Sequence, residues 1–423
     1  MPLQYPVHTT TLDNGLRVVV SPDPAVPIVA VNLWYDVGSR DEQPGQTGWA
    51  HLFEHLMFQG SANVASGEHL NTLQNVGGSV NATTSFDRTN YFETVPTGAL
   101  DLALWLEADR LASLADNLSQ ANVDTQREVV KEEKRQRYDN VPYGHAVRHL
   151  VELVFPSEHP YGHVTIGRMA DLDAATPETA QAFFGRHYRP ENAVLSLVGD
   201  LTVREGFRRA EKAFGWIAGG ERRPRTNTAP LPGLRGRPRQ EILADVPADA
   251  VYLAWRLPAR DSRRFDATDL ALAVLGDGQS SRLQRVLVRE RELAASASAG
   301  ALGLIAGTSL GLASARALPG VSPDDLEGAL TLEVERLASA GPTPSEVARA
   351  VVQFERLWLS ELAQVDARAD QFGGYATLHG DPERVNRRLA EVQAISVEEV
   401  GAAAAELLTP DRSAVLRYVK ETA

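Results

Sequence analysis

Two histidines and a glutamate stand close together in the segment from Gly48 to Gly60, which reads Gly-Trp-Ala-His-Leu-Phe-Glu-His-Leu-Met-Phe-Gln-Gly. His51 and His55 are four residues apart, so on a helix their imidazoles lie one above the other and can bind the same Zn²⁺ ion. Glu54 lies beside them, where a carboxylate can accept a proton from an attacking water and later deliver it to a leaving amine. The segment therefore predicts the chemistry of a zinc-dependent hydrolase.

The same segment has the pattern of one short helix with an apolar and a chemical face. We expect Thr47 to be its N-cap and Gly60 to end it. A chance His-x-x-Glu-His in a chain with 10 histidines among 423 residues has odds of about one or two in a hundred. A surface helix with incidental histidines is the alternative. The residues expected to face the core at the spacing i, i+3, i+4, i+7 are Trp49, Leu52, Phe53 and Leu56.

A catalytic zinc site also needs a third protein ligand and an open position for water. Carboxylates are concentrated in a later predicted helix. Glu133 follows Val129 by four residues and Val130 by three, so periodicity places it beside an apolar stripe and toward the interior. Glu128 and Glu132 share the charged outer face, where a solvated role is expected. The pattern predicts Glu133 as the third ligand.

Composition bounds the class of protein. The chain has 423 residues, of which 43% are hydrophobic and 23% charged, as in globular proteins of two or three domains, and no apolar run is long enough for a membrane helix. It has no cysteine, which excludes disulfides and thiolate metal sites. With 42 basic and 55 acidic residues the net charge is -13, so neither nucleic acid nor membrane is an expected partner. No signal peptide is visible, so we expect a cytoplasmic protein, or a periplasmic one if a leader is missing from this sequence.

Hydrophobic patterning predicts mixed α and β structure with two related halves. Residues 219–238 have the composition of a linker between domains at 1–218 and 239–423. The stretch 251–258 echoes the strand near 29–37, and 409–416 echoes 189–195, although a common turn-to-strand pattern is the alternative explanation. The expected elements of the first half are strands at 16–20, 28–35 and 189–200, a hairpin over 79–95 and helices over 49–58, 99–114 and 124–137.

Beyond the histidine helix, several segments make the sequence resemble the inverted-motif zinc peptidases that include pitrilysin, insulin-degrading enzyme and the mitochondrial processing peptidase. The resemblance runs over nearly the whole chain and implies an α+β fold of two homologous domains. Each domain would be a mixed, mostly antiparallel sheet flanked by helices, and only the first would hold zinc. The matching segments outside the helix are 12–16, 81–91, 95–96, 129–133, 188–192, 198–200 and 280–283.

The resemblance also implies roles for particular residues. Glu133 occupies the position of the family's third zinc ligand, and Glu54 that of its general base. The strand near 79–84 resembles the family's edge strand, which accepts an extended peptide by β-addition, so Asn81, Ala82 and Thr83 are candidate substrate-binding residues. An ordinary hairpin is the alternative for this strand.

The sequence departs from the family pattern in two places: the first, at Gln126, is expected to lower activity, and the second points to a partner. Gln126 stands where members usually carry a second glutamate, seven residues before the third ligand. Val288 and Ala295 align with a substrate-gripping Arg and Tyr, and neither can donate a hydrogen bond to an oxyanion. A one-residue gap could bring Arg289 into the first position. The resemblance therefore implies a related second chain that supplies the pair, a heterodimer being favoured over a homodimer.

Together these observations predict a zinc metalloendopeptidase subunit that acts on short or unfolded peptides. A non-catalytic structural or assembly subunit of the same fold is one alternative. A zinc hydrolase of a non-peptide amide is the other.

Overall fold

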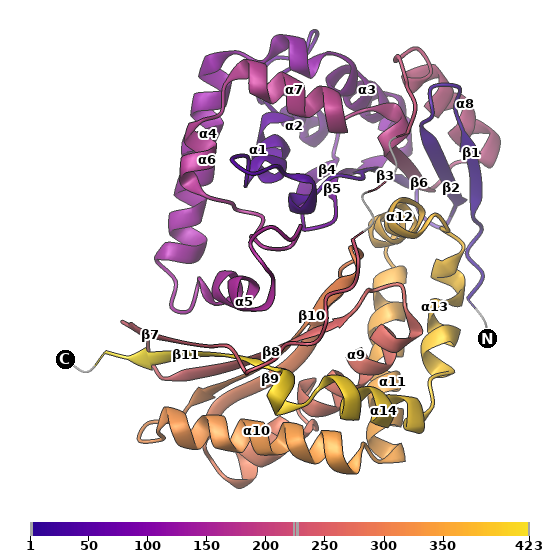
Figure 1. Ribbon diagram of the computed structural model, residues 1–423. Coiled ribbons are helices and arrows are strands. Elements are labelled where there is room, and N and C mark those ends of the chain that lie inside the picture. The colour runs from indigo at the N-terminus through magenta and orange to yellow at the C-terminus, as the bar shows by residue number, and fades with distance from the viewer. Residues whose placement is uncertain (1–2, 223–224, 226–227, 422–423) are drawn as a thin grey trace. The chain divides into compact units, whose positions relative to one another are not determined.

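The computed structural model describes residues 3–222, 225 and 228–421, and it forms two compact units (Figure 1). The first unit comprises the chain up to residue 134 together with 164–225 and 358–388. The second comprises 135–163, the chain from 226 to 357 and that from 389 onward. Each half of the sequence therefore contributes one segment to the unit built mainly by the other half.

The segment 219–238, expected as a linker, includes residues 223, 224, 226 and 227, which lie outside the described residues. The described part of this segment forms no helix or strand.

Strands of the first unit form a mixed sheet in the order β1-β2-β6-β3-β5-β4, and those of the second form one in the order β7-β11-β8-β10-β9. In the first sheet β2 and β6 run parallel, and the other neighbours are antiparallel. The strands are β1 (His8–Thr11), β2 (Arg17–Pro22), β3 (Ile28–Tyr35), β4 (Ser79–Thr84), β5 (Thr89–Pro96), β6 (Ala193–Gly199), β7 (Arg239–Ala244), β8 (Ala250–Pro258), β9 (Ala294–Leu302), β10 (Thr308–Ala317) and β11 (Ala414–Lys420).

Helices flank both sheets. Those of the first half are α1 (Trp49–Leu56), α2 (Glu68–Asn75), α3 (Leu100–Asn117), α4 (Gln120–Lys134), α5 (Ala146–Val154), α6 (Met169–Asp173), α7 (Pro177–His187) and α8 (Val203–Phe214). Those of the second half are α9 (Arg263–Gly276), α10 (Pro323–Ala340), α11 (Pro344–Leu362), α12 (Val365–Gly374), α13 (Arg384–Gln393) and α14 (Val397–Leu407).

The second sheet repeats the first without its β1. The parallel pair β7 and β11 corresponds to β2 and β6, and antiparallel β8, β10 and β9 follow in the places of β3, β5 and β4. The sequence echoes at 251–258 and 409–416 fall on β8 and β11, the counterparts of β3 and β6. The expected α+β fold of two related domains is confirmed.

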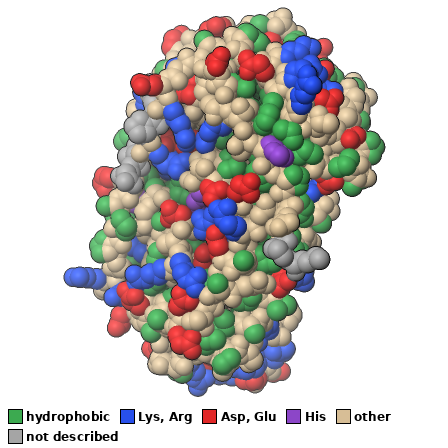
Figure 2. All heavy atoms as spheres, turned by 90° about the vertical axis from the view of Figure 1, so that its right-hand side faces the viewer, with side chains coloured by type: hydrophobic (Ala, Val, Ile, Leu, Met, Phe, Trp, Pro, Cys, Tyr) green, Lys and Arg blue, Asp and Glu red, His purple; other side chains and the backbone are tan. Residues whose placement is uncertain are grey.

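Acidic and basic side chains are interspersed on the face shown in Figure 2. Among the described residues, no helix combines the length and the apolar character that crossing a bilayer requires.

Alternation of side chains along the strands gives the first sheet two different faces. One face carries Tyr91 and Glu93 of β5 and is covered by α1, α2 and α3. The opposite face carries Trp34 of β3 and is covered by α12, a helix from the second half of the sequence (Figure 1). The close approach of α12 depends on Gly373, because a Cβ there would lie 2.6 Å from Cδ1 of Trp34.

This contact generates a prediction about stability. Gly373→Ala forces α12 away from Trp34, so we expect it to lower the free energy of unfolding by about 1–3 kcal/mol, as overpacking does, despite the better helix propensity of alanine. Urea unfolding followed by circular dichroism measures the change. Gly185→Ala in α7 is the matched control, because no atom lies within 4 Å of its added Cβ. Equal stability of the two variants would contradict this account of how α12 packs.

Candidate metal centre and active site

Two helices of the first unit bring the predicted ligands together. His51 and His55 lie on α1, and Glu133 lies in the last turn of α4, which packs against α1. The Nε2 atom of His51 is 3.4 Å from Oε2 of Glu133, and Nε2 of His55 is 3.3 Å from the same oxygen. The structure therefore places the three donors around one point, although Glu133 follows His55 by 78 residues in the sequence.

The spacing of these donors fits a tetrahedral zinc ion. Two ligands bound at about 2.0–2.1 Å with a tetrahedral angle between them are about 3.3–3.4 Å apart. The two measured His–Glu distances fall in this range, and all three donor atoms lie within 4.8 Å of one another. Two imidazoles and one carboxylate are also a donor set that catalytic zinc uses. His51, His55 and Glu133 thus fit Zn²⁺ in both chemistry and distance.

The N-terminus of α1 is built differently from the expectation. The helix is not capped by Thr47, whose hydroxyl instead donates to Oδ2 of Asp171 at 2.6 Å. Gly48 occupies the N-cap position with a φ of +91°, and a Cβ there would lie 2.8 Å from the carbonyl oxygen of Ile166. The Glu42 carboxylate accepts hydrogen bonds from the backbone N–H groups of Gly48 at 2.9 Å and of Ala50 at 2.8 Å, and so takes the place expected for Thr47.

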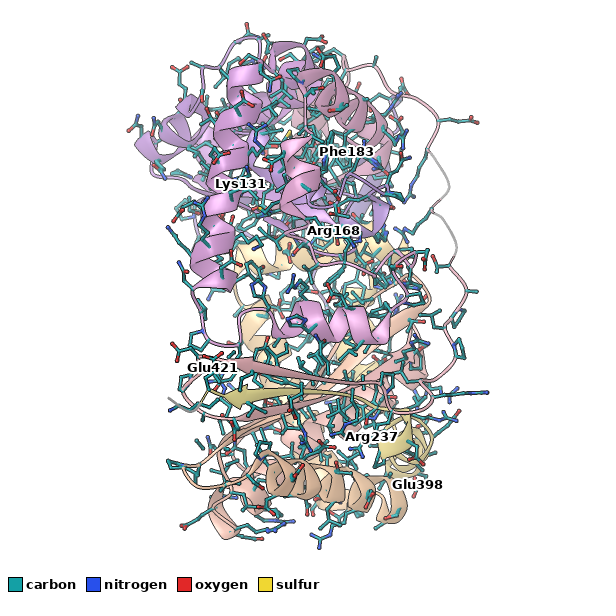
Figure 3. All side chains as sticks on the ribbon, turned by 60° about the vertical axis from the view of Figure 1, so that its left-hand side comes forward. Lys131, Arg168, Phe183, Arg237, Glu398 and Glu421 are labelled. Carbon is teal, nitrogen blue, oxygen red and sulfur yellow. The ribbon has the colours of Figure 1, made fainter. Side chains whose placement is uncertain are left out.

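The apolar face of α1 is the predicted one, and aromatic rings fix it in place. Trp49, Leu52, Phe53 and Leu56 are all buried. The ring of Phe53 stacks on that of Phe183 with centroids 5.0 Å apart, and Phe183 lies on α7 in Figure 3. This packing orients the helix so that its histidines turn toward α4.

The periodicity argument for Glu133 took both Val129 and Val130 as interior residues, and only one of them is buried. Val130 is buried as expected, but Val129 is 43% exposed and does not belong to the interior face. That face runs through Val123, Gln126 and Val130, and Glu133 continues it at the spacing of a helix. The amide of Gln126 is thus buried two turns before Glu133.

The rival carboxylates of α4 lie on its outer side. Glu128 and Glu132 are both exposed. Glu128 pairs at 3.2 Å with Lys131, which Figure 3 labels on the same helix. A solvated role for both glutamates agrees with this placement.

Glu54 faces a different neighbour from the two histidines. Its Oε2 atom accepts a hydrogen bond of 2.6 Å from the hydroxyl of Thr84, the last residue of β4. Burial raises the pKa of the Glu54 carboxyl above its usual value, and the nearby Glu133 carboxylate acts in the same direction, while the Thr84 hydrogen bond opposes the rise. Sequence reasoning missed Thr84, because its contact with Glu54 exists only after β4 has packed on α1.

The candidate substrate-binding residues lie on β4, which is the outermost strand of its sheet and, among the described residues, is paired only with β5. Asn81, Ala82 and Thr83 oppose Phe92, Tyr91 and Asn90 in the register. The Asn81 side-chain oxygen accepts a hydrogen bond of 2.9 Å from the Ala82 N–H.

A second cluster of possible metal ligands also contains an arginine. His69, Glu93 and Glu107 are buried near one another, but Arg110 donates to both Glu107 oxygens, at 3.0 Å from its Nε to one of them, and lies 3.7 Å from Glu93. Burial raises the pKa of Glu93, and although burial acts the same way on Glu107, the Arg110 guanidinium holds the pKa of Glu107 below its usual value. Burial lowers the pKa of His69 to about 3. Because the Arg110 guanidinium already supplies a positive charge beside both glutamates, the cluster is a poor metal site.

The second half supplies no obvious oxyanion donor at the aligned positions. Val288, in the π-helical segment Gln284–Glu290, packs against the core of the second unit. Ala295 and Arg289 are exposed.

Comparison with known proteins shows the family of the chain. Residues 17–162 match the insulinase (peptidase family M16) model, and residues 174–354 match the M16 inactive-domain model. The chain is 32% identical over 379 residues to the zinc protease PqqE of Helicobacter pylori, covering 88% of this chain and 83% of that protein.

Solved structures agree at the level of the fold. A protease from Helicobacter pylori superposes with a TM-score of 0.91 at 29% identity, covering 98% of this chain and 99% of that one. The periplasmic protease PqqL from Escherichia coli, at 19% identity and a TM-score of 0.77, aligns with 99% of this chain over 48% of its own length. The chain therefore belongs to the M16 peptidase family, with the His51–His55 motif in its N-terminal M16 domain and an M16 inactive domain in its second half.

Proposed function

We propose that this chain is the zinc-binding subunit of a metalloendopeptidase that hydrolyses short or unfolded peptides. The observation that carries the proposal is the pair of His–Glu distances, 3.4 and 3.3 Å, which match the edge of a zinc coordination tetrahedron. Zinc protease relatives support the same conclusion.

Each site residue has a separable task in this proposal. His51, His55 and Glu133 hold zinc, which when bound polarises a scissile carbonyl and lowers the pKa of water toward about 7. Glu54 accepts the proton of the attacking water and passes it to the leaving amine. Thr84 holds the Glu54 carboxylate in one orientation through its hydroxyl.

Strand β4 is suited to bind an extended peptide. As the outermost strand it has one side free of β partners within the described structure, and its last residue contacts the general base. A peptide added to this edge would pair through its backbone, which gives affinity with little dependence on sequence. The Asn81 side chain covers the Ala82 N–H and would have to move aside as the peptide adds.

A second related chain completes the proposal. Val288 and Ala295 cannot donate hydrogen bonds from their side chains, so part of the oxyanion stabilisation must come from elsewhere. This chain aligns with 48% of the length of PqqL of Escherichia coli, so that polypeptide has room for a second unit of the same size, as a two-chain enzyme would. We favour a heterodimer over a homodimer, because an identical partner would lack the same side chains.

The two rival functions predict different site chemistry. A purely structural subunit has no use for a metal-spaced donor set with a hydrogen-bonded carboxylate beside it, as found at Glu54. A hydrolase of small amides has no use for an open β edge next to that carboxylate.

The ligand assignment predicts a selective loss of metal. Glu133→Gln removes the charged ligand, and we expect zinc affinity to fall by more than about 100-fold, since changes outside the ligand shell alone cost 10–100-fold. Competition with a chromophoric chelator measures the affinity. Glu132→Gln, which changes the adjacent exposed carboxylate, should bind zinc like the wild type. Equal affinities of the two variants would refute the assignment.

The role of Glu54 predicts loss of hydrolysis without loss of metal. We expect Glu54→Gln to lower kcat/KM on a quenched fluorescent peptide by about 10²–10⁴-fold, the range for a general acid–base residue, with zinc content unchanged. A variant within threefold of the wild type would contradict the mechanism. A wild-type chain that binds zinc but, alone or with a related chain, cleaves no peptide would favour the structural alternative.

The partner proposal predicts activation by mixing. A related chain that carries the Arg/Tyr pair should raise the kcat of this chain by about 100-fold, the scale of an oxyanion donor, and should co-purify with it one to one. The assay uses the same peptide with each chain alone and with both. Full activity of this chain in isolation would show that no partner is required.

A further inference from the structure

We propose that Asp370, on the second-half helix α12, is a positioning residue that fixes the edge strand β4 for peptide addition. The inference rests on the proposed function, in which β4 receives the substrate beside Glu54. The observations that carry it lie entirely within the first unit.

The Asp370 carboxylate accepts hydrogen bonds from side chains on two neighbouring strands, β3 and β5. Its Oδ1 atom accepts hydrogen bonds from Nε1 of Trp34 at 3.0 Å, from Nδ2 of Asn32 at 3.2 Å and from Nδ2 of Asn90 at 2.8 Å. Asn32, Trp34 and Asn90 are buried, and buried amide groups are costly without acceptors. The carboxylate is therefore the acceptor around which this part of the sheet face is organised.

Asp370 can contact the strands because α12 packs closely on the sheet. Gly373 and Gly374 lie against the Trp34 indole, where a Cβ would come within 2.6 and 3.1 Å of ring atoms. Larger residues would hold the helix, and with it Asp370, further from the strands.

Asn90 links Asp370 of α12 to Thr83 of β4 through hydrogen bonds. Its Oδ1 atom accepts a hydrogen bond of 2.6 Å from the Thr83 hydroxyl and one of 2.9 Å from Nη1 of Arg88. The same Arg88 atom donates to the Thr83 carbonyl at 2.7 Å, and the guanidinium lies 5.1 Å from the centre of the Trp34 ring. Thr83 is thereby held through both its side chain and its backbone.

Because side chains alternate between the two faces of a sheet, β4 is held by side-chain contacts on both faces. Thr83 points to the α12 face of the sheet, and the next residue, Thr84, points to the α1 face, where it donates to Glu54. A strand at a sheet edge is paired on one side only, so side-chain contacts decide how rigid its free edge is. Asp370 thus acts on the substrate edge through Asn90 and Thr83 without touching substrate itself.

The test compares Asp370→Ala with Asp366→Ala, an exposed aspartate in the first turn of the same helix. Hydrogen–deuterium exchange of the zinc-loaded full chain reports on the strand without any need for activity. We expect residues 79–84 to exchange about tenfold faster in Asp370→Ala, with α3 unchanged, and Asp366→Ala to behave as wild type. Asp370→Asn, which keeps an acceptor oxygen, should restore most of the protection.

Kinetics supply the second readout. Because a loosened edge weakens peptide binding more than chemistry, KM for an extended peptide should rise about five- to tenfold in Asp370→Ala while kcat changes less than about twofold. Thr83→Val removes the hydroxyl that donates to Asn90, and because the position is partly exposed we expect the variant to fold. It should speed the exchange of residues 79–84 and raise KM, as Asp370→Ala does. It replaces Asp370→Ala if that variant does not fold.

Unchanged exchange of 79–84 in folded Asp370→Ala and Thr83→Val would overturn the inference. Faster exchange throughout the first unit would also overturn it, because Asp370 would then serve general stability only. If exchange changes as expected but the wild type cleaves no peptide, the positioning role stands and the proposed function fails.

Discussion

The separation between the imidazole nitrogens of α1 and the Glu133 carboxylate of α4 is the constraint on which the rest of the site depends. A tetrahedral ion tolerates only a few tenths of an ångström in its ligand positions, so the two helices must be held firmly. The structure does this with packing on one side and hydrogen bonds on the other. Phe53 stacks within an aromatic cluster, and Glu42 holds the first turn of α1 through two backbone N–H groups.

In the proposed mechanism, the first sheet separates the binding of metal from the presentation of substrate. Its α1 face supports the proposed zinc ligands, while its opposite face is covered by α12, which comes from the second half of the sequence. Strand β4 lies between these functions, because Thr84 contacts Glu54 on one face and Thr83 joins the Asp370 network on the other. The second half of the sequence thus contributes to the unit that holds the candidate metal centre.

How far the sequence predicts this arrangement depends on the range of each interaction. The candidate ligands on α1 and the buried stripe at Trp49, Leu52, Phe53 and Leu56 follow from helical spacing, which is local. Periodicity could select Glu133 even though Val129 is exposed, because Val130, three residues before Glu133, lies on the buried face of the same helix. The strand echoes between the halves correctly indicated related sheets.

The missed features all depend on contacts between distant segments. The capping of α1 by Glu42 instead of Thr47 requires the loop around Ile166 and Asp171 to be in place, and no cap motif in the local sequence encodes it. Likewise, the exchange of segments between the units and the reach of Asp370 to Asn90 join residues that are hundreds of positions apart.

The most direct test of the central claim is a crystal structure of the purified chain with anomalous diffraction recorded on both sides of the zinc absorption edge. The account predicts one strong zinc peak per chain, within bonding distance of Nε2 of His51, Nε2 of His55 and a carboxylate oxygen of Glu133. A zinc peak at another place, or imidazoles of zinc-replete protein turned away from Glu133 with no peak between them, would contradict it.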